Sequence, residues 1–290
     1  MKHKILLLII FLTTIAMKFD KPAYIIYDAK GSKSSYESMM DDLQKADIVF
    51  FGEMHENPIC HWLELQVAKD LYKEKKNNLV LGAEMFEADN QLILNEYLSK
   101  RVSEKSFEAE AKLWPNYKTD YKALLTFSLK NQIPFIATNI PRRYASMVNK
   151  GGFEALDALD VEAKKFIAPL PPKYDKELKC YKDMMGKDST NMAAAHITPN
   201  LPKAQAIKDA TMAYFIMKNR TKGKVFLHFN GSYHSEDHEG IVWYLKQMDP
   251  TLKIITIAST EQENINELSK ETLNKADYIL CIPDDMTKTH

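Results

Sequence analysis

The chain has 290 residues, of which 45% are hydrophobic and 27% charged, and 39 lysines and arginines balance 39 aspartates and glutamates. This length is sufficient for one large buried core, and the composition is that of a globular protein. The zero net charge and the lack of a basic stripe argue against a nucleic-acid partner, because proteins that bind nucleic acid usually carry a basic excess.

A short basic stretch followed by an apolar run opens the chain. Residues 2–4 read KHK and residues 5–17 read ILLLIIFLTTIAM. The run is shorter than the roughly 17–25 residues that a membrane-spanning helix needs. Its length and basic flank predict a signal peptide over residues 1–16, cleaved after Ala16. The alternative is a buried N-terminal strand or helix.

A signal peptide implies an exported protein, periplasmic or secreted, with no transmembrane helix in the mature chain. The first cysteine is Cys60, far beyond the apolar run, which argues against a lipid anchor on a processed N-terminal cysteine. Cys60, Cys180 and Cys281 form no C-x-x-C pattern, and we expect them to be small buried side chains.

Segments typical of strands and helices alternate along the rest of the chain. Continuous apolar runs predict strands, and apolar residues at helical spacing predict helices. In chain order we expect strands at residues 23–27, 47–52, 78–83, 133–138, 224–229, 253–258 and 278–282. The expected helices are residues 36–45, 59–75, 89–98, 120–132, 142–149, 203–219 and 236–247. This alternation predicts a single α/β domain over residues 20–290, with a mostly parallel, doubly wound sheet and helices on both faces.

Residues 153–202 interrupt the alternation. Prolines punctuate this stretch, and short helical segments lie between them. Methionines gather at positions 184, 185 and 192. We expect a small helical insertion or cap here and no additional strands.

Polar and ionisable residues follow four of the predicted strands. The segments read GEMHEN at 52–57, EMFE at 84–87, NIPRR at 139–143 and NGSYH at 230–234. Ligands of doubly wound sheets bind beyond the carboxyl ends of the strands, where these segments converge. Two of them share a G-x-x-H pattern, in which glycine lets the backbone turn sharply near a ligand. We therefore expect one pocket formed by Glu53, His55, Glu84 and His234.

This set of residues allows two kinds of chemistry. His55, Glu84 and His234 are suitable metal ligands. The same side chains are equally suited to act as a general base with an orienting carboxylate. Arg142 would supply a counter-charge for an anionic ligand or for Glu84, or else be a surface arginine at a helix start. For His61 and His238 we expect core or supporting roles and no direct ligation.

The motifs resemble the ChaN-like haem-binding family. The matching segments appear in family order between about residues 47 and 245. They are VFFGEMHENP, LVLGAEMFEADNQ, the helical region 117–127, PFIATNIPRR, KDATMA around Asp209, and NGSYHSEDHEGI. The G-x-x-H motifs and the glutamates also look like those of a wider group that includes erythromycin esterases and Tiki/TraB-type proteins.

The ChaN resemblance implies haem binding, a role in iron acquisition and a homodimer. It also implies a tyrosine ligand to the haem iron, with a histidine contributed across the dimer. Our candidates in the insertion are Tyr174, Tyr181 and His196, with the methionines there lining an apolar porphyrin surface. Membrane-anchored relatives carry a lipobox cysteine that this chain lacks, and no C-x-x-C-H motif is present for covalent haem attachment.

The wider resemblance implies a hydrolytic centre. In this interpretation His55 is the base, Glu53, Glu84 and His234 complete the site with Arg142, and Tiki-type members add a divalent metal. The sequence therefore leaves open a haem-binding protein and a hydrolase, with a fold used only for protein interaction as a third hypothesis.

Overall fold

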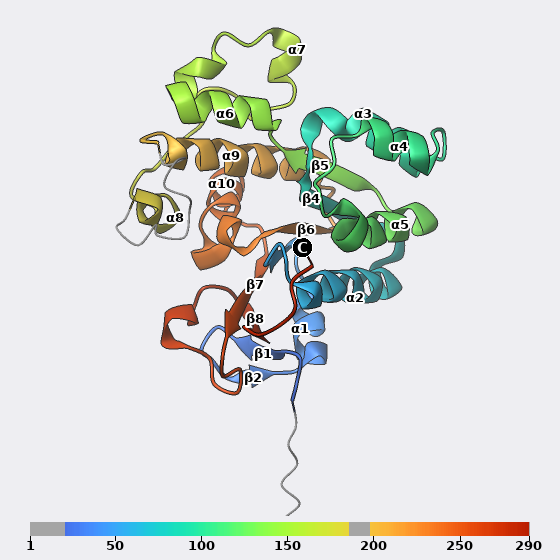
Figure 1. Ribbon diagram of the computed structural model, residues 1–290, viewed down its shortest axis with the longest axis vertical. Coiled ribbons are helices and arrows are strands. Elements are labelled where there is room, and N and C mark those ends of the chain that lie inside the picture. Colours follow the sequence, from blue (N-terminus) through green and yellow to red (C-terminus); the bar gives the residue numbers. More distant parts are fainter. Residues whose placement is uncertain (1–20, 186–197, 290) are drawn as a thin grey trace, which may run out of the picture.

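The structure is a computed structural model that describes residues 21–185 and 198–289 (Figure 1). The predicted signal peptide and two of the predicted haem-contacting residues, Met192 and His196, lie outside the described residues. Within the described ranges, none of the helices combines the length and the apolar character that crossing a membrane requires.

One sheet of eight strands organises the described chain. Its order is β2-β1-β8-β7-β3-β6-β4-β5. The strands from β8 to β5 pair in parallel, and β1 runs antiparallel to both β2 and β8. The prediction of a mostly parallel sheet in an α/β fold is therefore confirmed. The bounds are β1 Ile25–Asp28, β2 Lys33–Ser34, β3 Ile48–Glu53, β4 Leu79–Glu87, β5 Phe135–Asn139, β6 Val225–Gly231, β7 Ile254–Gln262 and β8 Tyr278–Pro283.

Helices cover both faces of this sheet, because side chains of the central strands alternate between two cores. Val49 and Phe51 of β3 face the core that includes helices α1 to α5, whereas Ile48 and Phe50 face the core of α6, α9 and α10 (Figure 1). Strands buried on both faces read as continuous apolar runs, as β3 does. The helices are α1 Tyr36–Leu43, α2 Pro58–Lys75, α3 Gln91–Leu98, α4 Glu104–Glu110, α5 Lys122–Asn131, α6 Arg142–Gly151, α9 Leu201–Asn219 and α10 Ile241–Met248.

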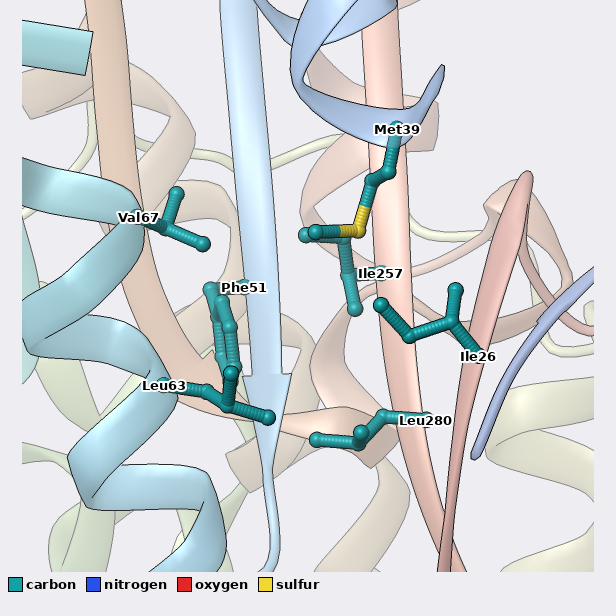
Figure 2. Close-up of a pocket in the computed structure, with 7 residues that line it drawn as sticks. All are labelled: Ile26, Met39, Phe51, Leu63, Val67, Ile257 and Leu280. Carbon is teal, nitrogen blue, oxygen red and sulfur yellow. The ribbon is translucent and has the colours of Figure 1, made fainter. Parts of the chain in front are cut away.

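The core between α1, α2 and the sheet is closed. Figure 2 shows Met39, Leu63 and Val67 from the two helices pointing at side chains of four strands. The space that remains among them is about 10 Å³, at the lower limit for a single water molecule. This part of the core therefore leaves no room for a ligand.

Between α6 and α9 the described chain contains short helices only. These are 3-10 turns at Phe153–Leu156 and Asp183–Met185, with α7 at Val161–Lys164 and α8 at Lys179–Lys182 between them. The methionine at position 184 is buried, whereas Met185 is exposed.

Two predicted helices begin differently than expected. The helix expected from residue 120 starts as a π-helical turn, Tyr117–Tyr121, before α5. The helix expected from residue 236 begins only at Ile241, because Asp237, His238 and Gly240 all have positive φ. A Cβ at Gly240 would collide with the carbonyl oxygen of His234. Both irregular segments lie next to the predicted pocket.

Candidate functional site

The carboxyl ends of β3, β4 and β6 bring the predicted pocket residues together. Glu53 pairs with Gly231 in the parallel ladder, and Ala83, directly before Glu84, pairs with Phe229. Glu84 then accepts a hydrogen bond from the backbone amide of Gly231 at 3.0 Å. The carboxyl ends of these three strands thus place two buried glutamates beside the second G-x-x-H motif.

His55 is oriented by a buried carboxylate. Its Nδ1 donates to Glu53 Oε1 at 2.5 Å, and the hydroxyl of Tyr121 donates to the same oxygen at 2.8 Å. The ring of Trp114 packs edge-on against the imidazole, with 5.0 Å between ring centroids. These contacts place the proton that Glu53 accepts on Nδ1 and fix the direction of Nε2. Among the described residues Nε2 has no hydrogen-bond partner, and the side chain is 41% exposed.

His234 is held by a similar pair of groups but has both nitrogens engaged. Its Nδ1 lies 2.5 Å from Asp209 Oδ1, and Tyr181 donates to the other oxygen of Asp209 at 2.7 Å. Its Nε2 lies 3.3 Å from Glu84 Oε1. A tyrosine–carboxylate–histidine series thus occurs twice, but only His55 leaves a nitrogen available to a ligand.

Gly231 permits the close approach between the two halves of the site. A Cβ at this position would lie 2.8 Å from His55 Nε2 and 3.8 Å from Glu84 Oε2. Any larger residue would displace the imidazole or the strand end. The first glycine of the other motif is similarly tight, since a Cβ at Gly52 would lie 2.8 Å from Ser232 Cα.

Electrostatics assign different charges to these side chains. Burial lowers the pKa of His234, but Glu84 and Asp209 outweigh that effect and raise it to about 10. Burial raises the pKa of Glu84, but the charges of His234 and His55 hold it well below its ordinary value. Burial lowers the pKa of His55, but the hydrogen bond to Glu53 and the charge of Glu84 outweigh this effect and raise the pKa above its ordinary value. At neutral pH the pair of His234 and Glu84 is therefore fully ionised.

A cavity of about 530 Å³ opens above this cluster. Its size lies within the range of about 300–1,000 Å³ that is usual for sites of small ligands and cofactors. The wall combines the polar strand ends with apolar side chains from the insertion and the adjacent loops. It is lined by Glu53, Met54, His55, Asp183, Met184, Gln205, Gly231, Ser232, Tyr233, His234 and Glu236.

The remaining predicted site residues lie apart from the cavity. Arg142 is exposed at the start of α6, and the described contacts of Glu84 are with His234 and Gly231, so the expected pairing of Arg142 with Glu84 is not formed. Tyr174 packs on Phe153 and Tyr181. Tyr181 is 1% exposed, with its hydroxyl committed to Asp209, so it cannot contact a ligand in this conformation.

The predicted metal ligands His55, Glu84 and His234 do not bring three ligand atoms within 4.8 Å of one another. Among the described residues, the group that meets this distance is Glu53, His61 and Glu64. The reason is that His234 directs its nitrogens at Asp209 and Glu84, while the imidazole of His55 turns toward Glu53.

Several residues of the site were not singled out by the sequence patterns. Glu64 lies at a buried position of α2, three residues after His61. A charged residue among the apolar positions of a helix is a signal that could have marked it as a candidate. Asp209 is likewise an acidic residue among the buried positions of α9. Tyr121 and Tyr233 carried no comparable signal, because tyrosine is common in ordinary cores.

The comparisons with known proteins concern the family and the fold. A family model described as "Haem-binding uptake, Tiki superfamily, ChaN" matches residues 39–245. The chain is also 26% identical over 202 residues to the protein RETICULATA-RELATED 5, chloroplastic, of Arabidopsis thaliana. That match covers 65% of this chain and 26% of the plant protein, so the chain spans about a quarter of the length of this relative.

Solved structures with a similar fold include ChaN of Campylobacter jejuni, whose structure is described as showing cofacial haem binding. It is 19% identical, with a TM-score of 0.65, and the match covers 89% of this chain and 96% of that one. A succinoglycan biosynthesis protein is 13% identical with a TM-score of 0.53 and coverages of 90% and 94%. An erythromycin esterase mutant in its open conformation is 12% identical with a TM-score of 0.50 and coverages of 86% and 93%. At these identities the likeness establishes the fold.

Proposed function

Because the chain belongs to the ChaN haem-binding uptake family of the Tiki superfamily, we propose that it binds haem in the cavity above β3 and β6 and serves haem or iron acquisition. The observation that carries this proposal is the state of His55. An imidazole whose Nδ1–H is held by a carboxylate presents Nε2 in a fixed direction, and a metal that binds there displaces any proton that the raised pKa of His55 retains on this atom. Histidine held in this way is a common axial ligand of haem iron.

The cavity wall suits the face of a porphyrin. Met54 and Met184 supply adaptable apolar surface, and Tyr233 adds a partly exposed aromatic ring. Tyr233 is also the tyrosine that lines the cavity, whereas Tyr174 and Tyr181 do not. We therefore place Tyr233 beside His55 as the alternative iron ligand.

The charges of the wall favour one orientation of the porphyrin. Asp183 is exposed at the cavity, and Glu236 lies there in an ion pair with Lys275 at 3.2 Å. Negative charge at this edge repels carboxylates. We therefore infer that a bound porphyrin would keep its propionates away from Asp183 and Glu236.

Titration of the purified chain with haemin tests this function. We expect saturable binding with a Soret band, and we expect His55→Ala to weaken the affinity at least about 10-fold, as loss of a metal-site group typically does. His238→Ala is the matched control, since His238 is exposed and pairs with Asp277 outside the cavity. A Tyr233→Phe variant identifies the alternative ligand. Haemin binding that is equally strong in all variants would show that the cavity is not the haem-binding site.

Two finer features belong to the same proposal. We propose that the chain is exported by its N-terminal segment and acts in the periplasm or outside the cell. We also propose that it forms a homodimer, in which the exposed Tyr233 rims of two cavities come together. Sedimentation with and without haemin tests the dimer, which should form more readily with haemin bound.

Hydrolysis is the second candidate function, and the same His55 observation supports it. A free Nε2 whose opposite nitrogen is held by a buried carboxylate is the arrangement of a general base. The protonated His234 beside Glu84 would then stabilise developing negative charge. A screen of ester and peptide substrates should find turnover that His55→Ala abolishes in a folded protein. Failure to find His55-dependent turnover argues for haem binding alone.

A further inference from the structure

A second cluster of ionisable side chains lies behind His55, on the α2 side of the sheet. Asn57 caps α2 by accepting from the amides of Ile59 and Cys60, with Pro58 in the first turn. This fixes the start of the helix, so that His61 and Glu64, three residues apart, lie on the same face. Both are buried and meet Glu53 at the end of β3.

The hydrogen bonds of His61 determine which nitrogen carries a proton. Its Nε2 lies 3.0 Å from the carbonyl oxygen of His55 and 3.5 Å from Asp120 Oδ2. Both neighbours are acceptors, so Nε2 must be protonated. Nδ1 is then the nitrogen that a metal cation can reach, once it has released any proton that it holds.

The Nδ1 atom of His61 faces two carboxylates. Glu53 Oε2 and Glu64 Oε2 each lie 3.3 Å from Nδ1. All three atoms lie within 4.8 Å of one another, and positive charge, carried by a proton on Nδ1 or by a bound cation, must offset the repulsion between the carboxylates. Glu53 Oε2 and Glu64 Oε1 are moreover buried without a hydrogen-bond partner within the described part of the chain.

We propose that Glu53, His61 and Glu64 form a binding site for a divalent transition-metal cation, such as Zn²⁺. The ligand atoms of a tetrahedral zinc site, with bonds of about 2.0–2.2 Å, stand about 3.3–3.6 Å apart. The two distances from His61 Nδ1 match this spacing. One cation of charge +2 balances two carboxylates in a buried position where net charge is costly.

The groups around the cluster are those that support a metal site. A metal-bound histidine usually donates its other N–H to a carbonyl or carboxylate, as His61 does toward His55 and Asp120. The non-ligating oxygen of Glu53 accepts from Tyr121 and His55. His61 also borders a surface groove of about 290 Å³ along α2, which gives an entry path. Metal uptake must release the protons that the free ligands hold.

The site does not rest on the proposed function, and its test uses no haemin. The purified full chain is equilibrated with Co²⁺ or Zn²⁺, dialysed, and analysed for metal content, with the d–d absorption of Co²⁺ as a second readout. We expect one ion per wild-type chain and at least about a 10-fold weaker affinity in both Glu64→Gln and His61→Gln. Glu84→Gln, which alters the set originally predicted from the strand ends, should retain the ion.

Three results would overturn the proposal. One is the absence of metal from the wild-type chain, which would mean that protons alone hold the cluster together. Another is unchanged affinity in Glu64→Gln. The third is loss of the ion in Glu84→Gln with retention in Glu64→Gln, which would place the metal at the strand ends. If Glu64→Gln fails to fold, His61→Gln and the wild-type cobalt spectrum decide the same question.

Discussion

The two histidines of the G-x-x-H motifs follow the same pattern but differ in chemical state. His55 gives one nitrogen to Glu53 and keeps the other for the cavity. His234 gives one nitrogen to Asp209 and the other to Glu84. Glu84 and Asp209 keep His234 positively charged, so it organises the site, whereas the half-exposed His55 has a nitrogen directed at the cavity, where it can act as a ligand or a base. The chemistry of the site therefore depends on His55.

The charged state of His234 predicts how stability varies with pH. Its pKa in the folded chain is about 10, above its ordinary value of 6.5. Between these values the folded state holds a proton that the unfolded state has released, so stability falls as the pH rises. We expect the contribution to be complete below about pH 6.5 and to decrease by up to about 1.4 kcal/mol per pH unit toward pH 10.

Urea unfolding at about pH 7 and about pH 9.5 measures this effect. In the metal-free chain, burial lowers the pKa of His61 but Glu53 and Glu64 raise it to about 11, so His61 adds to the slope in the same direction. A His234→Gln variant should be less stable at about pH 7 and show a shallower dependence. Wild-type stability that stays constant over this interval contradicts the assigned charges.

At the scale of elements, the end of β6 and helix α8 control the site. β6 ends at Gly231, where the chain passes close to His55. Helix α8 is tied to the loop after His234 by Lys179 with Asp237 and by the amide of Cys180 with Glu239. The insertion therefore contributes to holding His234, although it contributes no strand to the sheet.

Gly231→Ala tests the strand end. The backbone at Gly231 has a negative φ of −56°, so alanine brings no strain of its own. The added methyl group would lie 2.8 Å from His55 Nε2 and must displace the imidazole. We expect a weakening of haemin affinity with little change in melting temperature. Gly151→Ala, at the end of α6, is the remote control, and equal affinities in the two variants would refute the role given to this approach.

Tyr181→Phe tests the attachment of α8. Removing the hydroxyl leaves Asp209 with one partner fewer, and loss of a hydrogen bond to a buried charge costs about 1.5–3 kcal/mol of unfolding free energy. The Soret spectrum of the haemin complex should not change, because Tyr181 does not line the cavity. Tyr174→Phe, at a half-buried ring, is the matched control. A changed spectrum in Tyr181→Phe would restore Tyr181 as a haem ligand.

At the scale of the whole molecule, the sequence revealed the sheet better than it revealed the site. Strands such as β3 and β4 are buried on both faces. Their apolar runs, and the polar residues at their ends, could therefore be recognised from the sequence alone. The convergence of Glu53 and Glu84 follows from parallel pairing alone. The π-helical turn that aims Tyr121 at Glu53, and the loop before α10, depend on tertiary packing and gave no local signal.

The carboxylates that contact each histidine could not be predicted from the sequence either. Glu64 and Asp209 lie on helices α2 and α9, and which helical side chain reaches a strand end depends on how each helix packs across the sheet. The metal set predicted from the strand ends accordingly differs from the group that the structure assembles. The residue types at the strand ends predicted where the site lies. The hydrogen bonds within the site could be assigned only from the structure.

A crystal structure of the haemin complex tests the central claim most directly. We predict that the porphyrin lies in the cavity above β3 and β6, against Met54, Met184 and Tyr233, with His55 Nε2 directed at the iron. A porphyrin bound elsewhere on the chain, with His55 facing an empty cavity, would contradict this account.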